Sequence, residues 1–408
     1  MPRQSRHRAL AALLLPLLST CVTALQPRQD QSIAVKSRPD SDLFLYRPDT
    51  RGEYIRRVNQ LPTIYVIPSD EEVRAASRAI ATVARVLYGV PRVRVDRVHV
   101  GGSFGRKTSV KGRFDVDLSV FVNRFNPERD PKGAAEALEA AALQLEQHTG
   151  VNVTRRPGVY MVQLTWEGVH MDVPLVRNVA TDEDTDKAAR QVEVLVSPLF
   201  RMTDAEIAAM AAKPPDGMRE RAVSEALTDF VKEQPKTANE ATRLFKAWVK
   251  CGLAERGLLR SSKLPSVALE LIVLQAFQAE QAAPSHDFDP IRPERSLLIR
   301  VFLRALNTAA QLDGPCGSVV MLDAGALGYR REQGERFRAC WGAEGPFIIH
   351  PIDPTCNVAQ DPGDGHPPWD WPSLAREARA LLAGLRNASL EVLLHGSSLG
   401  AALERLQG

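Results

Sequence analysis

The sequence predicts an α+β fold, in which a mixed, twisted sheet with helices is followed by a mostly helical second domain. Three observations lead to this prediction. Strand-like and helix-like segments alternate between residues 69 and 176. From about Met202 onward, apolar residues recur at helical spacing. The chain has 408 residues, which is long enough for two domains of ordinary size, each with its own core.

The composition is that of a globular protein, with 44% hydrophobic and 25% charged residues. The formal net charge is only +3, so a nucleic-acid site would have to come from a local cluster of basic residues. The five cysteines show no Cys-x-x-Cys spacing. A disulfide framework or a zinc site is therefore unsupported, and free thiols are expected.

The N-terminus has the layout of a secretory signal peptide, or of the signal part of a longer organelle-targeting leader. Residues 1–8 are basic, residues 9–18 are apolar, and residues 22–24 (Val-Thr-Ala) resemble a small-residue cleavage site. The alternative is an apolar N-terminus without an address. The apolar run is too short to span a bilayer. We assign residues 1–24 to the leader and the polar residues 25–60 to a linker.

The first elements follow from capping and periodicity. Ser69 and Glu72 form a capping box that starts a helix, which ends at Gly89. A further helix is expected over residues 133–148, which are rich in Ala and Leu. Strands are expected over residues 91–100, 115–122, 159–166 and 169–176.

The second domain is expected to be built from helices separated by breaks that contain Pro or Gly. Thr237 and Glu240 have the spacing of a second capping box. The domain boundaries predicted from these patterns are 61–200 and 201–408. The expected helices cover residues 221–233, 237–252, 266–281, 295–312 and 371–385.

The most informative segment is 101–108, which reads GGSFGRKT, followed by KGRFDVDLSVFV over 111–122. It predicts a Gly-Ser turn that holds a triphosphate, leading into a strand. Because strand side chains alternate between faces, Asp115 and Asp117 point the same way. Paired carboxylates beside a phosphate-binding turn are suitable oxygen ligands for Mg²⁺.

A third carboxylate, Asp172, interrupts the apolar run of residues 169–176. A lone carboxylate in the core of a sheet is costly unless it is paired or binds a cation. The alternative interpretation is a carboxylate on an edge strand that faces water.

The helix expected over 237–252 has two faces. Its apolar face consists of Ala241, Leu244, Phe245 and Trp248. Arg243, Lys246 and Lys250 fall on the opposite side. By itself, such a basic stripe is typical of a solvated helix face.

These motifs together resemble those of the 2′-5′-oligoadenylate synthetases, within the DNA polymerase β-like nucleotidyltransferase superfamily. That family has GGSxGKxT followed by GxxDxDLxVF, and GVxxDV matches residues 168–173 here. Its RLxKxW motif matches residues 243–248, and its LPPQYALEL motif resembles residues 264–271. Its DPxDPTxNV motif matches the segment that ends at Val358, with His350 in place of the first Asp, and indicates a structural turn at residues 353–355.

The resemblance implies roles for individual residues. Asp115, Asp117 and Asp172 would hold two Mg²⁺ ions about 4 Å apart, and Asp172 would be the general base. Gly102 and Ser103 would bind the donor phosphates, together with Arg106, Arg243 and Lys246. Ser266 stands where the family has a Gln near the donor base, and Arg106 replaces a Lys of the family's turn.

The implied activity is polymerisation of ATP into 2′-5′-linked oligoadenylates with release of pyrophosphate. Activation by double-stranded RNA would involve Lys232 and Lys236, although acidic residues are interleaved with them. The alternatives are a cyclic-dinucleotide synthase, an RNA-tailing enzyme, or a catalytically silent RNA-binding scaffold. The family is expected in the cytoplasm or nucleus, whereas the leader indicates the secretory pathway or an organelle.

Overall fold

The structure is a computed structural model of the chain. It describes residues 66–212, 217–260, 264–283, 293–314, 319–361, 368–387 and 398–405. All of these belong to one compact unit, residues 43–408. The predicted leader at 1–24 and the predicted linker at 25–60 lie outside the described residues.

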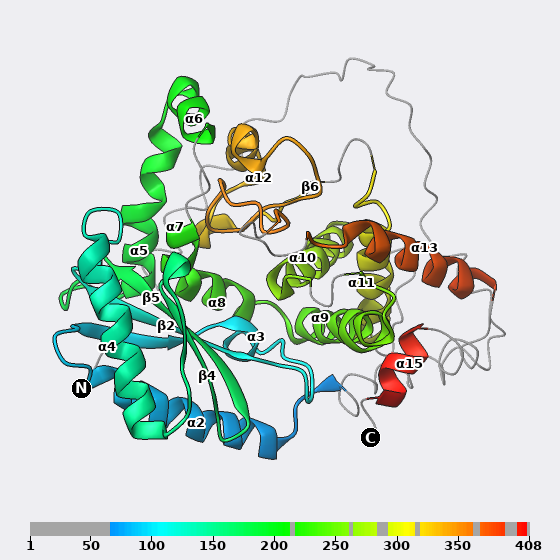
Figure 1. Ribbon diagram of the computed structural model, residues 1–408. Coiled ribbons are helices and arrows are strands. Elements are labelled where there is room, and N and C mark those ends of the chain that lie inside the picture. Colours follow the sequence, from blue (N-terminus) through cyan, green and yellow to red (C-terminus); the bar gives the residue numbers. More distant parts are fainter. Residues whose placement is uncertain are drawn as a thin grey trace, which may run out of the picture. The chain divides into compact units, whose positions relative to one another are not determined.

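A five-stranded mixed sheet forms the first half of the described chain (Figure 1). Its spatial order is β1-β2-β5-β4-β3, in which only β2 and β5 run parallel. β5 is therefore an interior strand. The strands are β1 (Val95–Val100), β2 (Val116–Asn123), β3 (Thr154–Arg156), β4 (Met161–Trp166) and β5 (Val169–Asn178).

Two long helices pack on this sheet and on each other, α2 (Asp70–Tyr88) and α4 (Pro131–Thr149). The capping box of Ser69 and Glu72 is confirmed. Asp130 caps α4 by accepting a hydrogen bond from the backbone N–H of Gly133, at 2.9 Å. The apolar faces of both helices and the inner face of the sheet form one hydrophobic core.

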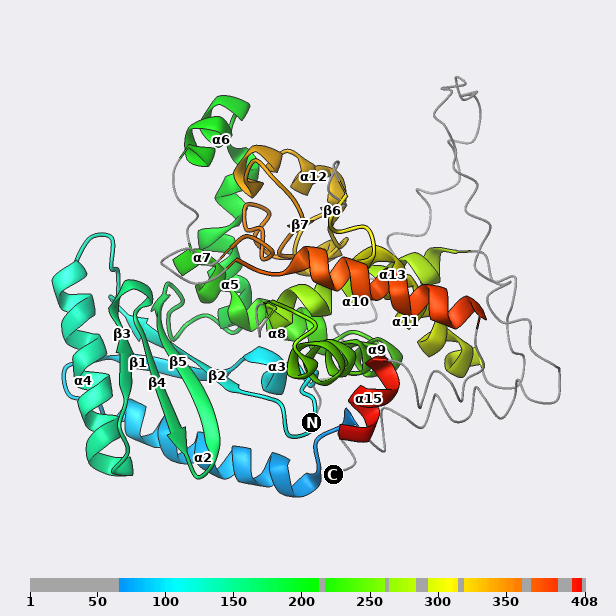
Figure 2. The same ribbon diagram turned by 45° about the vertical axis from the view of Figure 1, so that its right-hand side comes forward.

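Helices dominate the rest of the described chain and enclose a second, larger core (Figure 2). A two-stranded parallel sheet, β6 (Val319–Val320) with β7 (Phe347–Ile348), lies within this part. The helices of eight or more residues are α5 (Lys187–Leu195), α6 (Asp204–Ala211), α8 (Ser224–Lys232), α9 (Lys236–Ala247), α10 (Ser266–Ala282), α11 (Pro293–Ala309), α13 (Trp371–Asn387) and α15 (Ser398–Arg405). The shorter ones are α3 (Gly102–Gly105), α7 (Gly217–Ala222), α12 (Arg331–Glu335), the 3₁₀ turns at Pro157–Val159, Ser197–Arg201, Ala254–Arg256, Gly325–Leu327 and Arg338–Trp341, and the π turn Trp248–Leu253.

The predicted fold class, an α+β core with a mixed sheet followed by a mostly helical part, is confirmed. The domain boundaries at 61–200 and 201–408 stay a prediction. One expectation about local structure is wrong, and one strand was missed. The second capping box does not form, because α9 already begins at Lys236, after Pro235, and Thr237 is inside the helix. The short strand β3 was not predicted, since three residues with two arginines carry no apolar alternation.

The turn at Asp353 is structural, as the sequence indicates. The carboxylate of Asp353 accepts hydrogen bonds from Thr355 and, at 2.7 Å, from Arg219 on α7. His350, which replaces an Asp of the family motif, uses Nδ1 to accept from the backbone N–H groups of Ile352 and Asp353. Burial lowers the pKa of His350 to about 4, so a neutral imidazole serves as acceptor there.

The cysteines in the described part of the chain, Cys251, Cys340 and Cys356, form no disulfide with one another. Within the same residues, no helix combines the length and the apolar character needed to cross a membrane.

Candidate active site

The Gly-Ser turn lies between β1 and β2, and α3 is its single helical turn. The backbone N–H of Gly101 donates to the carbonyl oxygen of Asp117 at 2.8 Å, which fixes the turn on β2. Gly102 has φ +58°, and a Cβ there would lie 1.6 Å from Oδ2 of Asp117. A Cβ at Gly105 would lie 2.0 Å from the carbonyl oxygen of Val100. Glycine is therefore required at both positions by close approach.

The carboxylates of Asp117 and Asp172 come from neighbouring parallel strands and are direct partners in the β2–β5 register. Asp115 precedes β2 by one residue and is exposed. The pKa of Asp117 is raised to about 6, first by burial and then by the charges of Asp172 and Asp115, with Arg106 acting in the opposite direction. Negative charge is thus concentrated at one end of β2 beside the Gly-Ser turn.

The carboxylate of Asp172 is hydrogen-bonded within its own hairpin, and its side chain is 28% exposed. The amide Nε2 of Gln163 on β4 donates to Oδ1 of Asp172 at 2.7 Å, and the two residues are cross-strand partners. His170 Nε2 is 3.6 Å from the same oxygen. The alternative of an edge-strand carboxylate is wrong, because β5 is paired on both sides.

The carboxylates of Asp117 and Asp172 on adjacent strands are chemically suited to a hard divalent cation. The like charges that raise the pKa of Asp117 show that they lie close to one another. In the described residues, however, no three His, Cys, Asp or Glu side chains converge closely enough to form a metal centre. The metal ligands Asp115, Asp117 and Asp172 therefore stay a prediction.

A buried ion cluster joins the turn to the helices. Glu270 on α10 is fully buried and accepts from Arg106 Nε at 2.6 Å, from Thr108 Oγ1 at 2.6 Å and from Lys246 Nζ on α9 at 2.9 Å. Both views place α3 between β2 and α9 (Figures 1 and 2). The cluster therefore connects the Gly-Ser turn to the helical part.

The charges within this cluster are maintained at neutral pH. Burial alone would raise the pKa of Glu270, but Arg106, Lys246 and Thr108 outweigh it and bring the pKa to about 2. Burial lowers the pKa of Lys246 to about 8, against the attraction of Glu270. At pH 7 two cations thus share one carboxylate, which leaves the cluster with net positive charge.

The alternative interpretation of the basic stripe, a solvated helix face, is wrong for Lys246, which is 0% exposed. The predicted apolar face of Ala241, Leu244, Phe245 and Trp248 is buried. Sequence reasoning missed Glu270, although a charged residue inside the apolar run 267–274 was a signal for it. A charged residue in an apolar run is buried only when it is paired, so Glu270 indicates a buried ion pair with one of the basic residues.

Arg243 lies on α9, one turn before Lys246, and is half-buried. Its Nε is buried and has no hydrogen-bond partner among the described residues. Burial lowers its pKa, partly offset by Glu240. A buried guanidinium donor without a partner is costly, and a bound anion would satisfy it.

Ser266 is the first residue of α10 and is partly buried. Lys232 and Lys236 are exposed at the end of α8 and the start of α9. Lys236 Nζ is 3.5 Å from Glu240 on the same helix. The donor-base role of Ser266 and the RNA-binding roles of both lysines stay predictions.

Comparison with known proteins confirms the resemblance to the oligoadenylate synthetases. The chain is 28% identical to 2′-5′-oligoadenylate synthase 1A of Mus musculus over 306 residues, which span 70% of this chain and 74% of the relative. It is 25% identical to the Rattus norvegicus protein of the same name over 318 residues, or 71% and 77% of the two chains. No protein-family model matches the chain.

Among solved structures, the chain resembles CdnC in the E. coli MS115-1 CdnC:HORMA-deltaN complex. The TM-score is 0.50, with 13% identity, over 86% of this chain and 95% of that chain. At this identity the likeness shows a shared fold and no more.

Proposed function

We propose that this protein is a metal-dependent nucleotidyltransferase that polymerises ATP into 2′-5′-linked oligoadenylates and releases pyrophosphate. The observation that carries the proposal is the register pair of Asp117 and Asp172, placed against Gly102 of the Gly-Ser turn. The similarity to 2′-5′-oligoadenylate synthase 1A supports the choice of reaction and of ATP as substrate.

In this proposal Asp115, Asp117 and Asp172 would hold two Mg²⁺ ions, which would supply Lewis-acid activation of the acceptor hydroxyl and positive charge for the leaving pyrophosphate. Asp172, oriented by Gln163, accepts the proton of the acceptor 2′-hydroxyl. Because Asp117 and Asp172 lie on adjacent strands, an acceptor hydroxyl bound at Asp172 is close to a donor phosphate bound at Asp117.

The donor phosphates lie on the turn formed by Gly102 and Ser103. Arg243 supports this placement, since its buried Nε needs an anionic partner. Arg106 and Lys246 act through the net positive charge of their cluster with Glu270, which favours the developing charge of an in-line transfer. Ser266 contacts the donor base in this proposal, and its hydroxyl replaces the larger amide of the family.

The test is incubation of the full-length protein with ATP and Mg²⁺, with and without double-stranded RNA. Products are analysed by mass spectrometry and by digestion with nucleases specific for 3′-5′ linkages. Nuclease-resistant oligoadenylates support the proposal. Cyclic products or tailed RNA identify one of the two alternative enzymes, and no product from any nucleotide supports a silent scaffold.

We further propose that double-stranded RNA activates the enzyme by contacts of its backbone with Lys232 and Lys236. Both side chains are exposed, which allows such contacts. Equal rates with and without RNA in the assay above would reject activation and leave the catalytic proposal intact.

Replacing Gly102 by alanine should lower the transfer rate by about tenfold to a hundredfold, because the new Cβ displaces the carboxylate of Asp117. The matched control is Gly150→Ala. Gly150 also has a positive φ, +69°, but a Cβ there meets nothing within 4 Å. Both variants carry backbone strain of about 1 kcal/mol, so only Gly102→Ala should lose activity. Equal activity of the two variants would contradict the role of the turn.

Replacing Gln163 by leucine removes the hydrogen bond that orients Asp172. We expect kcat to fall about tenfold with little change in the KM for ATP, because Gln163 acts on the acceptor side only. Gln147→Leu, at an exposed position on α4, is the control and should leave both constants unchanged. A rise in KM at constant kcat would assign Gln163 to donor binding instead.

A further inference from the structure

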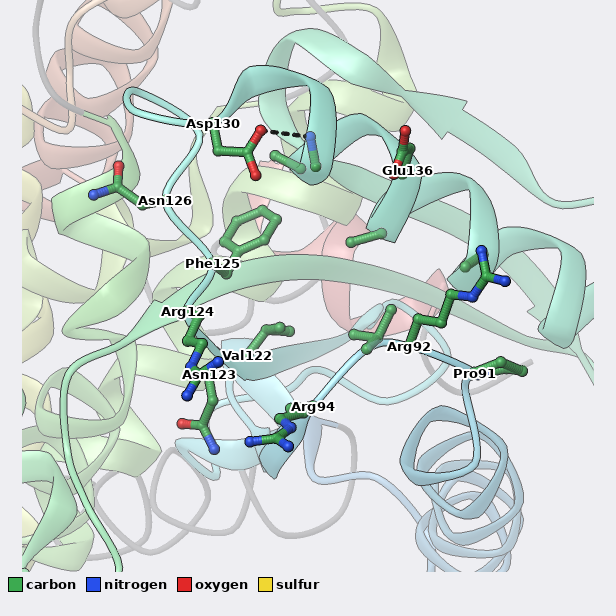
Figure 3. A pocket seen from close by; sticks show the side chains of 15 residues that line it. Pro91, Arg92, Arg94, Val122, Asn123, Arg124, Phe125, Asn126, Asp130 and Glu136 are labelled. Atoms are coloured by element: carbon green, nitrogen blue, oxygen red, sulfur yellow. Dashed lines mark hydrogen bonds between the residues drawn. The ribbon is translucent and has the colours of Figure 1, made fainter.

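A pocket of about 550 Å³ lies at the end of β2 away from the candidate active site (Figure 3). Its walls are the turn before β1 (residues 91–94), the end of β2 with the following loop (122–126), and the first three turns of α4. Five residues of extended strand separate Asp117 from Val122, which corresponds to about 17 Å. The pocket is therefore distinct from the carboxylate site.

Three arginines line this pocket, Arg92, Arg94 and Arg124. All three are exposed, and their guanidinium groups form no ion pair or hydrogen bond with any residue that the structure describes. The backbone N–H of Asn123 donates to the carbonyl oxygen of Arg94 at 2.8 Å, which holds the two arginine-bearing segments side by side. Figure 3 shows Arg94 and Arg124 on the side of the loop after β2, and Arg92 nearer to Glu136.

In the part of the chain that the structure describes, neither acidic residue of the pocket wall forms an ion pair with these arginines, and three arginines outnumber the two carboxylates. Asp130 accepts the capping hydrogen bond from Gly133 at 2.9 Å. Glu136 lies 3.9 Å from Lys132, one turn earlier on the helix. The pocket therefore presents unpaired positive charge in a concave site, where it attracts anions.

The backbone gives a second, independent indication. Arg92 has φ +65° and Arg124 has φ +62°, in the left-handed region that favours glycine. Backbone strain of this kind gathers at ligand sites, where the side chain is needed in spite of its cost. Two of the three arginines thus occupy a backbone conformation that glycine adopts more easily.

We propose that this pocket binds a small organic phosphate of nucleotide size. Arginine side chains bind phosphate oxygens in pairs, and the volume is in the range of small-molecule sites. Val93, Val122 and Phe125, with the alanines of α4, provide apolar surface for the uncharged part of the ligand. The proposal goes beyond the nucleotidyl transfer proposed above and does not depend on it.

The test is isothermal titration calorimetry of the full-length protein with tripolyphosphate and with ATP, in EDTA. The variant is Arg92→Ala/Arg94→Ala/Arg124→Ala. We expect its affinity for both probes to fall at least about tenfold. The matched control removes three exposed arginines of α2, Arg74→Ala/Arg78→Ala/Arg85→Ala, and should bind as the wild type does.

Arg243→Ala weakens the proposed donor site, so replacing the three pocket arginines in that background should still lower the affinity for both probes. Wild-type affinity in the pocket variant would overturn the proposal, as would an equal loss in the α2 control. The proposal would also be overturned if the protein bound long double-stranded RNA but neither tripolyphosphate nor ATP.

Arg124→Gly tests whether any loss of binding is a folding defect. Glycine adopts φ +62° without strain, so the midpoint of thermal unfolding should not fall, whereas binding of tripolyphosphate should weaken. Unchanged binding in a stably folded Arg124→Gly protein would count against the assignment of Arg124.

Discussion

Replacing Asp117 by asparagine should reduce nucleotidyl transfer on the order of 10³-fold, while making the metal-free protein more stable. The loss follows because an amide cannot supply the charge of a metal-binding carboxylate. It is measured as the rate of oligoadenylate formation at saturating ATP and Mg²⁺. Full activity of Asp117→Asn would show that the reaction does not need the Asp117 carboxylate, and would reject the proposed function.

The gain in stability follows from the pKa of Asp117, which is raised to about 6. Burial is the largest cause, and the charges of neighbouring carboxylates add to it. An unfolded aspartate has a pKa near 3.9, so the folded, metal-free protein holds this proton more tightly. The contribution of Asp117 to stability is therefore present below about pH 4 and is lost as the pH rises through about 6. Asparagine avoids that loss, which amounts to at most about 3 kcal/mol.

Chemical denaturation in EDTA at several pH values checks this expectation. The difference in unfolding free energy between Asp117→Asn and wild type should grow between pH 4 and pH 6 and then stay constant. Asp115→Asn is the control, because Asp115 is exposed and its replacement should change stability little. A metal-free Asp117→Asn protein that unfolds more easily than wild type at pH 7 would show that folding does not raise the pKa of this carboxylate.

Replacing Glu270 by glutamine should destabilise the protein by about 3–5 kcal/mol, the usual cost of leaving buried charge without its partner. Lys246 and Glu270 are both fully buried, and Arg106 is 6% exposed. Neutralising Glu270 would leave two cations close together in the interior. The midpoint of urea unfolding at pH 7 measures the effect.

The matched control is Glu335→Gln, which removes an ion pair at 3.1 Å to Arg331 between two exposed side chains. Its cost should be about 1 kcal/mol or less. Adding Lys246→Met to Glu270→Gln should recover part of the loss, since it removes one of the unpaired buried cations. If the double variant is less stable than Glu270→Gln alone, the destabilisation does not come from unpaired charge.

The pH dependence gives a further check on Glu270. Its folded pKa of about 2 lies below the unfolded value near 4.3, so its contribution to stability is complete above about pH 4 and is lost as the pH falls through 2. The difference between wild type and Glu270→Gln should therefore shrink below pH 4.

Local sequence patterns were sufficient where the cause is local. The helix from Asp70 to Tyr88 follows from the capping box at Ser69 and from apolar residues at helical spacing. The strand that carries Asp117 follows from alternation, and the need for glycine at Gly102 follows from the turn that the motif predicts. In these cases the determining residues are within about four positions of one another, so the chain itself specifies them.

By itself, then, the sequence determined the α+β class, most of the helices and strands, and the resemblance that points to nucleotidyl transfer. Only the tertiary structure decided that Asp117 and Asp172 are register partners, that Gln163 orients Asp172, and that Glu270 binds Arg106 and Lys246. The physical reason is separation along the chain. Glu270 is 164 residues from Arg106, and no periodicity within one helix or strand can report which distant charge will share its buried site.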